Sequence, residues 1–236
     1  MNSIAAHMIS NLTSCARFPG QLNVDIGEVT TNLVPFPKVH FVMSSISPLY
    51  TLSDVAAAAR TKNIDQTFSS AFSKDNQLCT GNPLQSKYLA CALLVRGGIQ
   101  LSDVNRNISR MMGQLDMVHW NQEGFKVGLC SVPPVKHPYS VLCLSNNCCV
   151  RSTFRKMEQR FRTLYDKRRA FVHHYTQYVE ESHFSESLEI IRAIQDDYSQ
   201  LQSAGTLHSI SDESEISATQ QRQGQYTPRS IYAPVI

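Results

Sequence analysis

The sequence predicts an α/β protein, because segments with strand character alternate with segments of helical periodicity. The clearest strand is Tyr88–Val95, whose nearly unbroken apolar run is typical of a strand buried on both faces. Two flanking stretches, Ile64–Phe72 and Ser102–Met111, place apolar side chains at helical spacing. With 236 residues, 42% hydrophobic and 17% charged, the chain is long enough for one sizeable core, or for one domain with an added helical layer.

The composition argues against several classes of protein. The net charge of +3 is mild and does not by itself indicate nucleic-acid binding. Seven cysteines without any C-x-x-C pair lack zinc spacing, and they predict reduced, mostly buried thiols in a cytosolic protein. We expect neither a signal peptide nor a membrane span, which needs about 20 apolar residues. The adjacent His173 and His174 point to different helix faces and do not predict a metal site.

The amino-terminal part of the chain predicts two helices separated by a turn. Residues Met1–Cys15 repeat apolar side chains at helical spacing, and the chain begins inside that pattern without an N-cap signal. A second helix over Val24–Leu33 is preceded by Pro19-Gly20 and followed by two prolines that end it. Asp25 and Glu28 have the spacing of a capping box, in which Asp25 accepts from an early N–H of the helix and Glu28 reaches back to the N–H of the cap residue.

The middle of the chain predicts a mixed sheet of about four strands. Residues Lys38–Met43 alternate and are β-branched, so we expect a strand there with His40 packed in it. Residues 44–63 are the least regular, and Ala56–Ala59 is either a short helix or a loop. Ser102 is the expected cap of its helix. Further strands are expected at Met117–Trp120, Phe125–Val132 and Tyr139–Leu144.

The carboxy-terminal part predicts an antiparallel helix pair. Residues Arg151–Arg169 carry an apolar stripe and eight basic residues, whereas Glu186–Leu201 carries a second stripe with acidic residues. The basic face is either a solvated face with a local acidic partner, or a site for nucleic acid or an acidic protein; the stretch lacks an interleaved stacking platform for bases. Residues 203–236 are rich in Ser, Gln and Thr, and we expect them to be disordered.

Several short segments of the sequence resemble the tubulin family. Gly20-Gln-Leu-Asn23-Val-Asp25, with its flanking residues Arg17–Pro19 and Asn32–Pro37, resembles the loop that tubulins insert into the nucleotide of the next subunit. Four further segments resemble the ε type more than the α, β or γ types; they are Ser47–Leu52, Ala71–Asp75, Tyr88–Leu93 and Trp120–Phe125. The resemblance runs from Met1 to about Leu201.

The resemblance implies roles for five residues. Glu28 matches the position that is Glu in the catalytically competent α type and Lys in the β type, and Asp25 matches the second acid of the loop. Both are candidate catalytic residues that position water at a neighbouring subunit's nucleotide. Gly20 and Asn23 are candidate interface residues that shape the loop. Asn2 matches a residue that holds the guanine base in the family. The capping and catalytic roles of the two acids are compatible.

The resemblance also implies a division of the chain. Residues 1–19 correspond to the end of the tubulin central helix, 20–150 to the intermediate α/β domain, 151–202 to the helical region and 203–236 to a tail. Glycines are scattered, and no glycine-rich phosphate loop occurs. The chain therefore looks like the carboxy-terminal half of a tubulin. GTP is the expected cofactor of the intact family member and is not expected to bind this chain alone, so GTPase activity stays open.

The function implied is that of a structural, GTP-binding cytoskeletal protein of centrioles, centrosomes and basal bodies in the cytoplasm. The expected partners are other tubulins, through longitudinal contacts, and centriolar or microtubule-associated proteins; neither nucleic acid nor membrane is expected. An alternative is an interaction module that holds a centriolar partner through the basic Arg151–Arg169 face without nucleotide. A third possibility is a non-functional product with an exposed apolar face.

Overall fold

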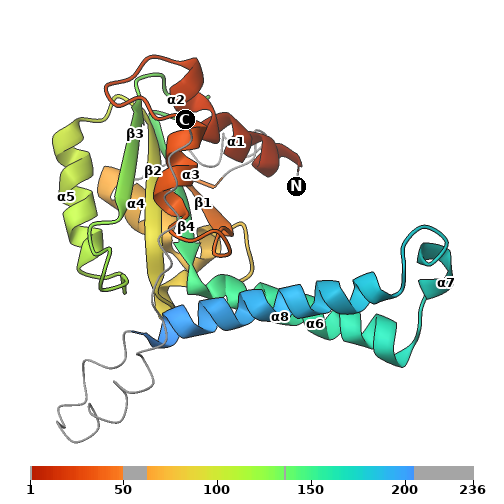
Figure 1. The fold of residues 1–236 in the computed structure, drawn as a ribbon. Helices are drawn as coiled ribbons and strands as arrows, with labels where there is room; N and C mark the ends of the chain where they lie inside the picture. The colour runs from red at the N-terminus through yellow and green to blue at the C-terminus, as the bar shows by residue number, and fades with distance from the viewer. Residues whose placement is uncertain (1, 50–62, 136, 205–236) are drawn as a thin grey trace, which may run out of the picture. The chain divides into compact units, whose positions relative to one another are not determined.

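A four-stranded mixed sheet forms the centre of the fold in the computed structural model, which describes residues 2–49, 63–135 and 137–204. The strand order is β1 (Val42–Ser47), β4 (Tyr139–Asn147), β2 (Tyr88–Gly97) and β3 (Phe125–Cys130). β2 and β3 are parallel, and the other pairs are antiparallel (Figure 1). The predicted α/β class with a mixed sheet is confirmed.

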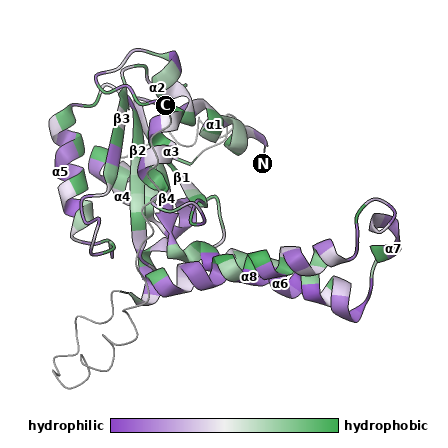
Figure 2. Ribbon diagram, viewed as in Figure 1, coloured by the Kyte–Doolittle hydropathy of each residue, from purple (hydrophilic) through white to green (hydrophobic). Residues whose placement is uncertain are grey.

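The central strand β2 separates two apolar cores. All ten of its residues are buried, as the apolar run predicts, because helices cover both faces of the sheet. Cys91, Leu93 and Val95 join the core beneath α4 (Ile64–Phe72) and α5 (Leu101–Met112). The alternate side chains enter the second core, beneath α1 (Asn2–Leu12), α2 (Ser14–Arg17) and α3 (Ile26–Leu33); these are Ala90, Ala92 and Leu94. Figure 2 shows the apolar residues gathered on the strands.

The helix at Ile64–Phe72 has the predicted bounds, and Phe68, Ala71 and Phe72 are buried as expected. The cap predicted at Ser102 is wrong. Helix α5 begins one residue earlier, at Leu101, and its N-cap Gln100 makes no side-chain bond to the helix.

The strand predicted at Lys38–Met43 is displaced, because β1 begins at Val42. The prolines before it produce a turn instead, closed by a 3.0 Å bond from the Val39 N–H to the Phe36 carbonyl. His40 is therefore not packed in a strand. It is exposed, its ring stacks on Phe41 at 4.4 Å, and its Nδ1 lies 2.8 Å from the Pro37 carbonyl oxygen.

The strand predicted at Met117–Trp120 is also wrong, because only one isolated bridge, between Met117 and Tyr88, forms there. A turn replaces it, in which the Asn121 N–H bonds the Val118 carbonyl at 3.1 Å. The Asn121 side chain fixes this turn by donating to the Leu89 carbonyl at 2.9 Å. The other strands were placed correctly, with ends that differ by two or three residues.

Two long helices lie side by side beyond the sheet (Figure 1). They are α6 (Arg151–Arg162), which continues into the π-helical turn η5 (Thr163–Lys167), and α8 (Ser182–Ser203), with the short α7 (Val172–Tyr175) between them. The Arg151 guanidinium donates to the Ser199 hydroxyl at one end, and the Tyr165 ring stacks on Phe184 at the other. The predicted antiparallel pair is confirmed, although α-helical geometry ends at Arg162 rather than at Arg169.

Helix α8 is joined to the sheet through Tyr198, which is fully buried. Its hydroxyl donates to Asn146 Oδ1 on β4 and accepts from the Phe41 N–H, each at 3.2 Å. Burial raises the pKa of this phenol. The described residues as far as Gln202 form one unit. The expectations for Ala56–Ala59 and for the tail from residue 205 lie outside the described residues.

Candidate functional site

The predicted loop lies between α2 and α3 and is fixed along β3. The Leu129 N–H donates to the Leu22 carbonyl at 2.8 Å, and the Ser131 N–H donates to the Pro19 carbonyl at 3.1 Å. Gly20 lies directly against the same strand, because an added Cβ would stand 1.7 Å from the Leu129 carbonyl oxygen. Only glycine allows the two backbones this approach.

Val24 determines which side chains of the loop face outward. It is buried in the second core beneath α3, whereas its neighbours Asn23 and Asp25 are exposed. Gly128 of β3 leaves room for it, since a Cβ there would lie 3.2 Å from a Val24 methyl carbon and 3.0 Å from the Cys15 sulfur. The loop is thus anchored by one apolar side chain and presents polar ones on either side.

Asp25 begins helix α3 as its N-cap, as the sequence predicts. Its backbone is extended, and its Oδ1 accepts from the Ile26 N–H at 2.7 Å. The reciprocal half of the expected capping box is absent. The Glu28 carboxylate lies instead 3.2 Å from the Nζ of Lys126 on β3. A carboxylate at the first turn of a helix is favoured by the helix dipole, so both acids suit this position.

Glu28 and Lys126 form a half-exposed ion pair, with 53% and 33% of their side chains exposed. Such pairs contribute about 0–1 kcal/mol, so the pair does little for stability. What it does is orient the Glu28 carboxylate over the edge of the sheet. Lys126 is the residue of this site that sequence reasoning missed, because its approach to Glu28 depends on how β3 lies against α3.

At the entry to the loop, the ring of Phe18 lies close to two guanidinium groups. The Arg17 and Arg96 guanidinium carbons lie 4.9 and 5.6 Å from the centre of its ring. Arg96 is buried, and it donates to the carbonyls of Val132 and Pro133 beyond β3. The pKa of nearby His7 is lowered, first by burial and then by the charge of Arg96.

The structure brings together Gly20, Asn23, Asp25 and Glu28, and it places Asn2 elsewhere. Asn2 is exposed in the first turn of α1, at the end of that helix opposite to the loop (Figure 1). A helix of this length spans about 16 Å. Asn2 therefore cannot share a ligand atom with the two carboxylates within one chain.

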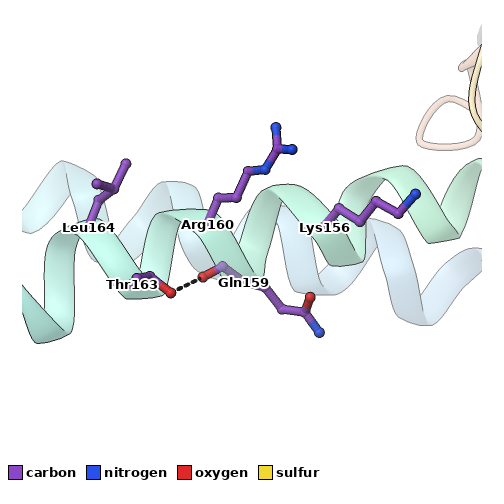
Figure 3. A pocket seen from close by; sticks show the side chains of 5 residues that line it. All are labelled: Lys156, Gln159, Arg160, Thr163 and Leu164. Carbon is purple, nitrogen blue, oxygen red and sulfur yellow. Dashed lines mark hydrogen bonds between the residues drawn. The ribbon is translucent and has the colours of Figure 1, made fainter.

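In the part of the chain that the structure describes, no group of three or more His, Cys, Asp or Glu side chains is placed to hold a metal ion. None of the helices in that part has the length and apolar character to cross a membrane. Two open pockets of about 380 and 450 Å³ lie along α6 (Figure 3), and no residue of the Gly20–Glu28 loop lines them.

Comparison with known proteins gives a family match and a set of relatives. Residues 37–159 match the family model of the tubulin C-terminal domain. The chain is 52% identical to the human tubulin epsilon chain over 203 residues, which are 85% of this chain and 42% of that protein. It is 51% identical to the mouse tubulin epsilon chain over 209 residues, 88% of this chain and 43% of that protein. Identity to the tubulin alpha-3 chain of Saccharomyces cerevisiae is 35%, over 84% of this chain and 46% of that protein. The chain thus spans less than half the length of the relatives it matches.

Proposed function

The chain belongs to the tubulin family of cytoskeletal proteins, and from this premise we propose that it acts in the manner of an ε-type tubulin, through longitudinal contact with another tubulin subunit. In that contact the Gly20–Glu28 loop meets the nucleotide of the neighbour. GTP belongs to the intact family member and to the neighbouring subunit in this proposal. The chain contributes the residues that act on that nucleotide.

The observation that supports the proposal is the combination of a fixed loop with exposed acids. The loop backbone is hydrogen-bonded to β3 at Leu22 and Pro19, so its position does not depend on a partner. Asp25 and Glu28 nevertheless remain exposed at the start of α3. A rigid support with outward-facing carboxylates is what a group needs if it is to act on a ligand outside its own chain.

The geometry suggests how the two acids divide the work. Bound GTP supplies an electrophilic γ-phosphorus and a stable leaving group. Glu28 orients a water molecule for in-line attack and accepts its proton, and Lys126 holds the carboxylate in place. Asp25 has one oxygen engaged with the Ile26 N–H, and its other oxygen is available to the same water. The acids suit this role and not a phosphate cradle, which needs N–H donors and cations.

The proposal is tested by mixing the 236-residue chain with a GTP-loaded tubulin subunit and measuring phosphate release in a single turnover. We expect Glu28→Ala to slow the release about a hundredfold, the usual size of a lost general base. The control is Glu189→Ala, which removes an exposed carboxylate from α8. Equal rates for the Glu28 variant and the unaltered chain would contradict the catalytic role.

The proposal extends to cellular place and partners. We place the protein at centrioles, centrosomes and basal bodies, with other tubulins and centriolar or microtubule-associated proteins as partners. We also propose that residues 1–19 end a central helix, 20–150 form an intermediate domain and 151–202 form a helical surface region. Tagged protein that stays away from centrioles in dividing cells contradicts the cellular placement, whatever the role of Glu28.

A second candidate function is partner binding through the basic face of α6 without nucleotide. It is favoured by cations on α6 that lack an acidic partner in the described residues, among them Lys156 and Arg160. Binding that weakens with salt and persists in Glu28→Ala supports this candidate. Binding that disappears in Glu28→Ala counts against it.

A further inference from the structure

The two pockets along α6 adjoin each other, because Lys156 lines both of them. The larger pocket, of about 450 Å³, lies between the start of α6 and the segment before β2. It is lined by Lys74, Cys79, Thr80, Gly81, Asn82, Ser152 and Lys156. The smaller one continues along the helix and is lined by Lys156, Gln159, Arg160, Thr163 and Leu164 (Figure 3). We call this surface the α6 groove.

The groove carries three cations, and two acids of the hairpin pair with cations outside it. Glu158 faces α8, where it pairs with Arg192 at 3.0 Å, and it also pairs with Arg162 of its own helix at 2.9 Å. Glu181 pairs with Arg169 near the far end of the hairpin. In the described part of the chain, the three cations of the groove form no ion pair; they are Lys74, Lys156 and Arg160.

From these observations we infer that the α6 groove binds an extended acidic peptide of a partner protein, in which acidic residues alternate and are followed by an apolar residue. The inference rests on the second candidate function above and names the chemistry of the partner. Charge complementarity identifies the acidic character. The apolar position is identified by Leu164, whose side chain is half exposed at the end of the groove.

The spacing of the groove residues explains why the peptide is extended. Lys156, Arg160 and Leu164 follow one another at intervals of four residues, which is about 6 Å along a helix. Side chains on one face of an extended strand recur at about 6.8 Å. Alternate residues of an extended peptide can therefore meet the three side chains in turn. Gln159 and Thr163 also line this pocket. The Thr163 hydroxyl donates to the Gln159 carbonyl at 2.8 Å, so its oxygen can accept from the peptide backbone, whereas the Gln159 amide points away from Arg160 and Leu164 (Figure 3).

The lining of the groove favours a peptide over a nucleic acid. Single-stranded nucleic acids bind where bases stack on aromatic rings between the cations. No aromatic residue lines either pocket. Binding of an oligonucleotide is therefore an outcome that the test must include, and one that would overturn the inference.

The test measures binding of fluorescein-labelled peptides to the full 236-residue chain by anisotropy. The probe has the sequence SESESLS, made also in reverse order, and the control SEESSLS has the same charge with adjacent acids. We expect Lys156→Glu and Arg160→Glu to weaken binding of the probe about tenfold or more. Arg155→Glu is the matched control, since Arg155 is exposed on the same helix and lines neither pocket. We expect it to weaken binding less than about threefold.

Cys79 gives an independent readout of where the peptide binds. It is the exposed one among seven free cysteines, and it lines the larger pocket. A peptide in the groove slows its alkylation by a neutral maleimide. If Arg155→Glu and Lys156→Glu weaken binding equally, the α6 groove is not the binding site. The second candidate function, in which the basic face of α6 binds a partner, would still hold. Equal affinity for SEESSLS, an unprotected Cys79, or tighter binding of oligo-dT than of the probe also overturns the inference.

Discussion

The sheet with its flanking helices and the α6–α8 hairpin are stabilised by different interactions. In the sheet, β2 is buried along its whole length between two apolar cores. In the hairpin, Phe154 is the buried residue of α6, and the helices are joined by ring stacking and by the hydrogen bonds of Glu158. Most side chains of α6 and α8 are therefore at least partly exposed, and Figure 2 shows hydrophilic and apolar residues mixed along both helices. Substitutions in the two regions should differ accordingly.

The largest expected effect is on the sheet. Leu94 is 1% exposed and packs in the core beneath α3, so Leu94→Ala removes buried apolar surface and leaves a cavity. We expect it to lower the free energy of unfolding by about 3 kcal/mol, measured by urea denaturation. Leu164→Ala, at a half-exposed position on the hairpin, should change it by less than about 0.5 kcal/mol. Similar losses for both variants would remove the contrast between the two regions.

A smaller loss of stability is expected for a substitution where the Gly20–Glu28 loop meets β3. In Gly20→Ala the new Cβ would meet the Leu129 carbonyl oxygen at 1.7 Å, so the loop must move away from β3. We expect a destabilisation of about 1–3 kcal/mol in thermal denaturation. Gly98→Ala is the control, because no atom lies within 4 Å of its added Cβ. If Gly20→Ala is as stable as Gly98→Ala, the loop is not fixed in the way described.

A still smaller loss of stability is expected at Tyr198, which joins the hairpin to the sheet. Tyr198→Phe leaves Asn146 Oδ1 without its donor and the Phe41 N–H without its acceptor. We expect a loss of about 1 kcal/mol, with faster hydrogen exchange in the carboxy-terminal half of α8. Tyr178→Phe, at a position 87% exposed, serves as the control. Unchanged exchange in α8 would mean that packing of the ring alone holds the hairpin.

The smallest expected effects are changes of stability with pH, which should occur in different pH ranges for the sheet and for the hairpin. Burial lowers the folded-state pKa of His7, beside the sheet, below its ordinary 6.5. The unfolded chain then takes up the proton first, so stability falls as pH drops below about 6.5. On the hairpin, the bonds from Gln195 and Arg192 lower the pKa of Glu158 below 4.5. Its stabilisation is complete above pH 4.5 and is lost as pH falls below that value.

The pH prediction is checked by urea denaturation at a series of pH values. His7→Gln should remove part of the decline between about pH 6.5 and 5 and leave the acid decline unchanged. Glu158→Gln should do the opposite. Identical profiles for the two variants would show that neither group acts in its expected range.

Elements whose partners are close in sequence were well predicted. Ile64–Phe72 has its own capping residues, Asn63 and Gln66, and its own apolar face. The run that begins at Tyr88 is apolar enough to predict a buried strand without knowledge of the elements that pack against it. Lys38–Met43 and Met117–Trp120 also alternate, but turn bonds from Val39 and Asn121 take their backbone groups. Alternation predicts a strand only where a neighbouring strand is free to pair with it.

The candidate site shows the same limit. The Asp25 cap depends on the next residue and was predicted correctly. Glu28 was expected to bond its own helix, and its true partner Lys126 comes from a strand far along the chain. The groove along α6 was visible only as a run of basic residues. Its shape depends on the segment from Lys74 to Asn82, which reaches α6 only in the folded chain.

The position of β4 has a consequence for how the protein is made. β4 lies between β1 and β2, and Val42 of β1 pairs with Asn146, which is synthesised roughly a hundred residues later. During synthesis, the edges of β1 and β2 that pair with β4 therefore stay unpaired until β4 has left the ribosome. Open strand edges invite pairing with other chains. We expect the nascent chain to depend on chaperones until Asn147 leaves the exit tunnel, and to become independent of them soon after.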